Sequence, residues 1–164
     1  MKSLIFAPST VFLISLIVAI SALGAAFVAQ FSFGLKPCIL CLYARVPYVF
    51  LIIVSVLALL NGEKHNRLFL ILLTIGFLAS LAIAGFHVGV EQHWWELSGG
   101  CPVEKLAAKT SEEMLADLLA TPLAPCDKVA WKVFDISIVI WNAALSLVMC
   151  AYLLLALLKK KADA

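Results

Sequence analysis

The chain has 164 residues, of which 64% are hydrophobic and 13% are charged, and its mean hydropathy is +1.08. A soluble domain has roughly 45 to 50% apolar and about 25% charged residues, so this composition excludes a water-soluble core and a disordered chain. Twelve basic and ten acidic residues leave a formal charge of +2, which is too balanced for a nucleic-acid-binding surface. We therefore expect a protein whose solvent is the lipid bilayer.

Four apolar segments are long enough to cross a bilayer as helices, which takes roughly 20 residues each. The first exceeds the roughly 7 to 15 apolar residues of a signal peptide, so we interpret it as a retained helix. The expected fold is an all-α membrane protein, a four-transmembrane-helix bundle in a single domain over residues 1–164. We predict helices at about 9–31, 40–60, 68–88 and 136–158, with outer loops at about 32–39 and 89–135.

The second outer loop carries a further helix signal. Thr110 and Glu113 have the spacing of a capping box, and Met114, Leu115, Leu118 and Leu119 follow at helical spacing until Pro122. We predict a short amphipathic helix in this loop, lying on the membrane surface.

Basic residues near the helix ends indicate the orientation. The two sides of the membrane carry equal numbers, but those on the side of the termini are concentrated in short segments, where the positive-inside rule has most weight. This places both termini in the cytoplasm. The basic residues on that side are Lys2, Lys64, Arg67, Lys159, Lys160 and Lys161.

The same topology places four cysteines, Cys38, Cys41, Cys101 and Cys126, in the two outer loops. Disulfides form and persist on that side of the membrane. Cys150 lies inside the fourth helix among apolar residues, where a thiol acts as a small hydrophobe. Two cysteine pairs in one oxidising compartment suggest redox chemistry.

The segment from Leu35 to Arg45, LKPCILCLYAR, is the most informative part of the chain. We expect Pro37 at the first helical position, which puts Cys38 and Cys41 in the first turn of the second helix. The partial positive charge of a helix N-terminus favours thiolates. Arg45 follows Cys41 by four residues, so it shares that helical face and adds a permanent cation.

Three other roles are possible for these cysteines. A zinc site formed by Cys38, Cys41, Cys101 and Cys126 is disfavoured. Structural zinc ligands usually come in pairs close together in the sequence, and Cys101 and Cys126 are too far apart for that pattern. A c-type haem requires histidine directly after the second cysteine, where this chain has Leu42. Two purely structural disulfides remain possible, although a disulfide within Cys-X-X-Cys closes so short a loop that it stabilises the folded protein little.

The cysteine motif at the head of the second membrane helix, followed by a cysteine pair in the second outer loop, resembles the bacterial DsbB family of disulfide-bond formation proteins. The segment FHVGVEQHWW from Phe86 to Trp95 is similar to the end of that family's third helix. Cys126, Trp131 and Trp141 with its neighbour Asn142 resemble its entry into the fourth. In the vitamin K epoxide reductase relatives, the loop pair comes before the membrane pair instead. Asp135 departs from the small uncharged residue expected of the family.

The resemblance implies an oxidoreductase of the bacterial inner membrane, which takes electrons from a periplasmic DsbA-type thiol oxidase and passes them to a quinone, either ubiquinone or menaquinone. Cys101 would be attacked by the partner's thiolate, and Cys126 would then attack Cys38. This leaves Cys41 as a thiolate beside the quinone. Arg45 and His87 are expected to contact the quinone, and no metal is expected.

A function of another class is the alternative. A four-helix membrane scaffold of tetraspanin type also has a cysteine-bearing second outer loop, with purely structural disulfides. Arg45 beside a Cys-X-X-Cys at a helix start argues against it, since a structural bridge gains little there.

Overall fold

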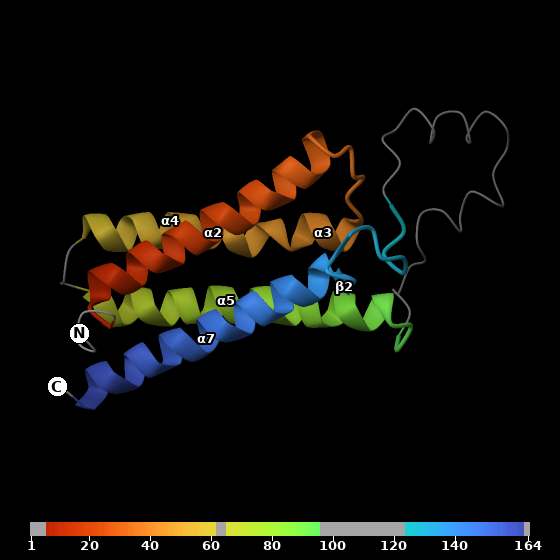
Figure 1. The fold of residues 1–164 in the computed structure, drawn as a ribbon. Coiled ribbons are helices and arrows are strands. Elements are labelled where there is room, and N and C mark those ends of the chain that lie inside the picture. The colour runs from red at the N-terminus through yellow and green to blue at the C-terminus, as the bar shows by residue number, and fades with distance from the viewer. Residues whose placement is uncertain (1–5, 62–64, 96–123, 163–164) are drawn as a thin grey trace, which may run out of the picture.

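The computed structural model describes residues 6–61, 65–95 and 124–162 (Figure 1). Four of its helices, counting α3 and α4 as one, are long and apolar enough to cross a membrane. The expected all-helical bundle is confirmed, whereas the amphipathic helix predicted near residue 110 lies outside the described residues. The elements are α2 (Pro8–Phe31), α3 (Ile39–Tyr43), α4 (Arg45–Leu60), α5 (Asn66–Glu91), β1 (Lys132–Val133), β2 (Ile136–Ser137) and α7 (Ile138–Ala162).

The second membrane span is divided at Ala44, between α3 and α4. Pro47 has no N–H to donate to the carbonyl of Tyr43, so the helical hydrogen-bond ladder is interrupted there. The side chain of Pro47 is buried. The division therefore separates the cysteine-bearing turn from the long helix that begins at Arg45.

A β-hairpin formed by the two-residue strands β1 and β2 precedes the last helix. The helix therefore begins at Ile138, two residues after the predicted position. Phe134 and Asp135 at its tip have φ angles of 53° and 60°, as the type I′ turn requires at both central residues. Aspartate is among the non-glycine residues that adopt this conformation most readily. The turn thus accounts for Asp135, the residue that departs from the family pattern.

The hairpin is held against α7. Ile138 N–H donates to the carbonyl of Trp131 at 3.2 Å, and Trp141 Nε1 donates to the carbonyl of Val133 at 3.2 Å. Ser137 Oγ accepts from Val139 N–H at 3.2 Å, which caps the first turn of the helix. These bonds fix Trp131 at the mouth of the bundle.

The helices pack in a chain of neighbours: α2 on α4, α4 on α5, and α5 on α7. The largest buried side chains, among them Phe12, Leu51, Leu73, Phe77 and Leu153, fill the middle of the bundle and the end where α2 begins and α7 ends. Towards the other end α2 diverges from α7 (Figure 1). Direct packing between these two helices is therefore slight, and the cysteine motif lies at the end where they part.

The third membrane helix runs to Glu91, three residues beyond its predicted end. Trp95 folds back on this last turn, with its ring 5.7 Å from that of Phe86 and its Nε1 donating to the Phe86 carbonyl at 3.0 Å. A Cβ added at Gly89 would overlap the Trp95 ring, whereas one added at Gly85 would meet nothing within 4 Å. Position 89 thus requires glycine, because Trp95 folds back over it onto the end of α5.

We predict that Gly89→Ala lowers the free energy of unfolding by about 1 to 3 kcal/mol, because the Trp95 ring must leave its place and lose its hydrogen bond. Gly85→Ala is the matched control on the same helix, and we expect it to be neutral or to stabilise by up to about 1 kcal/mol. Unfolding in detergent micelles by titration with a denaturing detergent measures both. Equal effects of the two variants would contradict the packing of Trp95.

Candidate functional site

The cysteine pair lies at the beginning of α3. Cys38 is the N-cap residue, and its Sγ accepts from the Cys41 N–H at 3.3 Å. Pro37 therefore stands before the cap and not at the first helical position, which corrects the sequence-based prediction. In this position the Cys38 sulfur satisfies one of the N–H groups that the first turn leaves unpaired.

The two thiols form one hydrogen-bonded unit. The Cys38 thiol donates to Cys41 Sγ at 3.1 Å. This bond, followed by burial, raises the pKa of Cys38, against the lowering expected from the helix N-terminus alone. Cys38 is thus the member of the pair that retains its proton, and Cys41 is the member that accepts.

Cys126 lies beside this pair. It is 1% exposed and belongs to a small buried cluster with Cys38, Leu40 and Val90. The segment that carries it is tied to the motif, because Ala124 N–H donates to the carbonyl of Pro37 at 3.3 Å. The structure therefore brings Cys126 to the first pair, whereas Cys101 lies outside the described residues.

His87 completes the polar centre from α5. It is buried, one turn before the end of that helix, and its Nε2 lies 3.5 Å from Cys38 Sγ. The ligand atoms of Cys38, Cys41 and His87 all lie within 4.8 Å of one another, a spacing that could also hold a metal ion. The zinc site considered from the sequence combined Cys38 and Cys41 with Cys101 and Cys126, and it did not include His87.

A cavity of about 300 Å³ lies where α2 and α7 diverge, and α4, α5 and the hairpin contribute to its walls. Cys41, Arg45 and His87 all line it. Most of the other lining residues are alanine, leucine, isoleucine or tryptophan, so the walls are largely apolar. The three residues predicted to face a quinone therefore share one cavity that lies within the membrane-spanning part of the bundle.

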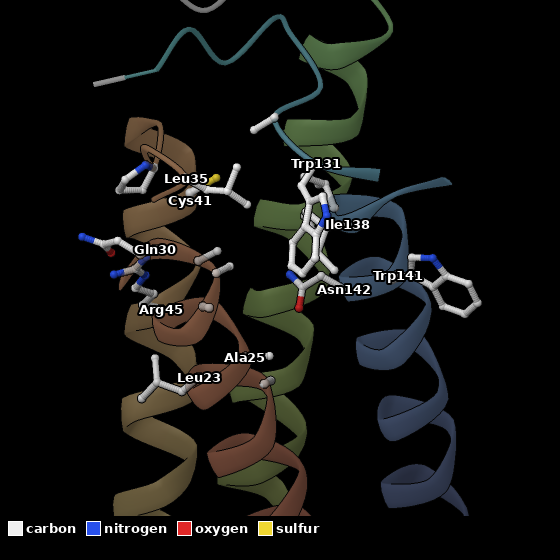
Figure 2. A pocket seen from close by; sticks show the side chains of 18 of the residues that line it. Leu23, Ala25, Gln30, Leu35, Cys41, Arg45, Trp131, Ile138, Trp141 and Asn142 are labelled. Carbon is white, nitrogen blue, oxygen red and sulfur yellow. The ribbon is translucent and has the colours of Figure 1, made fainter. Parts of the chain in front are cut away.

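Arg45 and Gln30 occupy the side of this cavity formed by α2 and α4 (Figure 2). The Arg45 guanidinium lies 4.9 Å from the centre of the Phe27 ring, within the range of a cation–π contact. Its Nε and the Oε1 of Gln30 are buried and have no hydrogen-bond partner among the described residues. Burying polar atoms without partners is costly, so this wall is suited to a ligand with polar groups.

Other polar residues of the cavity were not expected from the sequence. Tyr48 on α4 donates to Asn142 on α7, and Trp131 lines the same cavity from the hairpin. The available signals were Gln30, the only amide in the first apolar segment, and Asn142, the only amide in the last, because polar residues within membrane helices tend to be functional.

These residues fit a quinone ring. Ligand pockets are typically apolar with a few placed polar groups, and this one supplies apolar walls, the cation Arg45 as hydrogen-bond donor, and the sulfur of Cys41. The unpartnered Arg45 Nε suits a carbonyl oxygen. A flat, mostly apolar ring with oxygens at its edge has the chemistry that this lining accepts.

Comparisons with known proteins identify the family of the chain. The family model described as "Disulfide bond formation protein DsbB" matches residues 8–156. An uncharacterised protein of Rickettsia prowazekii (strain Madrid E) is 30% identical over 92% of this chain and 88% of its own length. Disulfide bond formation protein B 2 of Pseudomonas savastanoi pv. phaseolicola is 29% identical, covering 80% and 77% of the two chains. Disulfide bond formation protein B of Aromatoleum aromaticum is 22% identical, covering 98% and 99%.

No solved structure matches the chain. The family model, however, extends from the start of α2 almost to the end of α7 and includes the cysteine motif. Such a match supports an enzyme and not the tetraspanin-like scaffold kept as the alternative. The protein accordingly belongs to the DsbB family of disulfide-bond formation enzymes.

Proposed function

We propose that this enzyme reoxidises a periplasmic DsbA-type thiol oxidase and delivers the electrons to a membrane quinone. The observation that carries the proposal is the two-sided position of the cysteine motif. Cys38 packs against Cys126 in the buried cluster, while Cys41 lines the cavity between the helices. Thiol–disulfide exchange on one side can thus be coupled to electron transfer on the other.

The exchange begins from two disulfides, Cys101–Cys126 and Cys38–Cys41. The partner's thiolate attacks Cys101, forms a mixed disulfide and displaces Cys126 as a thiolate. Cys126 attacks Cys38, and the bond between Cys38 and Cys41 breaks with its electron pair on Cys41. The burial of Cys126 beside Cys38 supports this step.

The cycle closes when the remaining bonds exchange. The partner's second thiolate attacks its own mixed disulfide, which oxidises the partner and releases Cys101. Cys101 re-forms its bond with Cys126 and releases Cys38. Cys38 and Cys41 regain their disulfide as the electron pair leaves through the cavity, so one dithiol is oxidised in each cycle.

Arg45 and His87 would act on the cavity side. When bound, a quinone supplies an acceptor for two electrons and two protons. Arg45 stabilises the Cys41 thiolate, which lies one helical turn before it, and donates a hydrogen bond to an oxygen where negative charge develops. His87 would carry a proton between the thiols and a bound quinone. Its approach to Cys38 from α5 and its place in the cavity lining support this role.

The enzyme would lie in the bacterial inner membrane, with both termini in the cytoplasm and its cysteines towards the periplasm. Two observations support this orientation. The beginning of α2 and the end of α7 share one end of the bundle, and the cysteine motif lies at the other (Figure 1). The basic residues concentrated near the termini favour the cytoplasm for their end.

We predict that the purified protein, mixed anaerobically with quinone and a reduced DsbA-type protein, reduces one quinone for each partner dithiol oxidised. Quinone absorbance and free thiols are followed together. Cys38→Ser and Cys101→Ser should abolish the coupled reaction, because each removes a sulfur that must exchange. Cys150→Ser is the matched control, since Cys150 packs in the core with Met149 and Leu153, and it should retain activity.

Two outcomes would overturn this function. A partner that stays reduced beside untouched quinone, with both disulfides intact by mass, would make the cysteines structural. Stoichiometric zinc that binds the reduced protein tightly and depends on His87 as well as on both motif cysteines, without any quinone reduction, would make the centre a metal site.

We predict that Cys41→Ser stops quinone reduction but still allows one round of exchange between the partner and the second cysteine pair. The serine leaves the Cys101–Cys126 disulfide in place but no disulfide at Cys38 for Cys126 to attack, so a reduced Cys101 and Cys126 pair should form for each partner dithiol that is oxidised. The amount of this reduced pair after acid quenching is measured by mass. Continued quinone turnover by this variant would show that Cys41 is not the electron donor.

We predict that Arg45→Ala raises the KM for quinone by about ten- to a hundredfold, because it removes a charge-assisted hydrogen bond in a water-poor site. The rate of disulfide exchange with the partner should be unchanged. Arg45→Lys should recover only part of the loss, since lysine keeps the charge but not the planar fork. Arg67→Ala, at the exposed start of α5, is the control; equal KM values for the Arg45 and Arg67 variants would refute the role.

A further inference from the structure

A hydrogen-bonded pair of side chains lies at the cavity with no part in the exchange described above. Tyr48 Oη donates to Asn142 Oδ1 at 2.5 Å, and both residues line the cavity. Tyr48 is 4% exposed and Asn142 is half-buried. The pair is therefore enclosed by the helices and remains in contact with the space that Cys41 and Arg45 share.

The bond connects two helices that do not pack closely on each other. Within the described part of the chain, α4 packs mainly on α2 and α5, and α7 packs mainly on α5. Tyr48 and Asn142 are 94 residues apart in sequence. The contact thus spans the space between α4 and α7 at the cavity, where the helix backbones do not meet.

A polar pair at this place is not required for packing. The surrounding walls include Ala84, Ile138 and Leu145, and phenylalanine with leucine would fill the same space without polar atoms to satisfy. Hydrogen bonds between membrane helices contribute only modestly to stability. A tyrosine and an asparagine facing an apolar cavity are therefore better explained by a ligand than by the bundle.

The geometry indicates which atom is offered to that ligand. The Tyr48 hydroxyl donates to Asn142 Oδ1 and so fixes the orientation of the side-chain amide. The two N–H groups of Nδ2 remain as donors. Asn142 and Trp131 face Arg45 and Gln30 from the opposite side of the cavity (Figure 2). One cavity thus has hydrogen-bond donors on two opposing walls.

We propose that Asn142 is a second hydrogen-bond donor to the quinone, contacting the carbonyl oxygen opposite the one bound by Arg45, and that Tyr48 positions its amide. The inference rests on the proposed function and adds a binding residue to it. A para-quinone has carbonyl oxygens on opposite sides of its ring, and negative charge develops on both during reduction. Donors on two walls match this chemistry and fix the ring between α4 and α7.

The test compares Asn142→Leu and Tyr48→Phe with a variant that loses an interhelical hydrogen bond elsewhere. Ser146→Ala is that control, because Ser146 Oγ and Ser80 Oγ are hydrogen-bonded at 3.0 Å between α7 and α5, and neither serine lines the cavity. Asn142→Ser, which retains a shorter donor, serves as the second variant at the same position.

Binding is measured without turnover. In a Cys38→Ser, Cys41→Ser background, ubiquinone-1 and menadione are titrated while tryptophan fluorescence is followed, since Trp131 and Trp141 line the cavity. We expect Asn142→Leu to raise Kd by about three- to tenfold, the loss of one hydrogen bond, and Tyr48→Phe by about two- to threefold. Combining the two should add little to Asn142→Leu alone, because Tyr48 acts through Asn142.

A spectroscopic measurement separates direct contact from bracing. In infrared difference spectra of bound ubiquinone-1, one carbonyl band should shift to higher frequency in Asn142→Leu and only partly so in Asn142→Ser. Ser146→Ala should leave both Kd and the band unchanged, and thermal unfolding of every variant reports its stability.

Two results would overturn the inference. Unchanged Kd and carbonyl bands in Asn142→Leu, with a loss of stability like that of Ser146→Ala, would reduce the pair to a brace between helices. If Asn142→Leu fails to fold, Asn142→Ser and Tyr48→Phe provide the test. Wild-type Kd values and carbonyl bands in these two variants would refute the contact. Failure of the proposed function looks different, since the parent protein itself would then not bind or reduce quinone.

Discussion

The structure depends on one placement: a pair of cysteines in the first turn of a helix, at the end of the bundle where the loop after α2 meets the second span. Cys38 caps α3 with its sulfur, and Cys41 lies inside the turn that this cap begins. Because the second span is divided at Ala44, this turn is separate from the long helix that crosses the bilayer. The pair can therefore contact a loop cysteine on one side and an intramembrane cavity on the other.

The cavity results from how the helices pack. The large core side chains lie in the middle of the bundle and at its far end, where they hold α2, α4, α5 and α7 together. At the cysteine end, Ala22, Ala25, Ala26 and Ala29 line the side of α2 that faces the cavity. Small side chains leave space that large ones would fill. The hairpin then closes the opposite wall with Trp131, and the left-handed conformation of its two turn residues makes this reversal possible.

Much of this architecture could be predicted from the sequence, because hydropathy and length alone identify spans in a bilayer. The cysteine motif and the helical spacing of Arg45 likewise indicated the chemistry without coordinates. The helix faces could not be predicted in the same way. A helix that is apolar all round carries little amphipathic pattern, so nothing local shows that Tyr48 meets Asn142, or that Gln30 and Trp131 face the cavity. The capping role of Cys38 also depends on local geometry, since the sequence of the motif is equally compatible with Pro37 at the first helical position, two places further into the helix than in the structure.

The two cysteines of the motif are chemically unequal, and this inequality gives the site a direction. The hydrogen bond runs from the Cys38 thiol to the Cys41 sulfur, and the pKa of Cys38 is raised by that bond and by burial. Cys38 is also the residue next to Cys126, whereas Cys41 is the one that lines the cavity with Arg45. The better leaving group in an exchange is the thiol that is more readily held as a thiolate. In the proposed exchange, an attack from the loop side on Cys38 would therefore place the negative charge on Cys41, beside Arg45 and next to the cavity. The fold would then order the transfer from the loop towards the membrane.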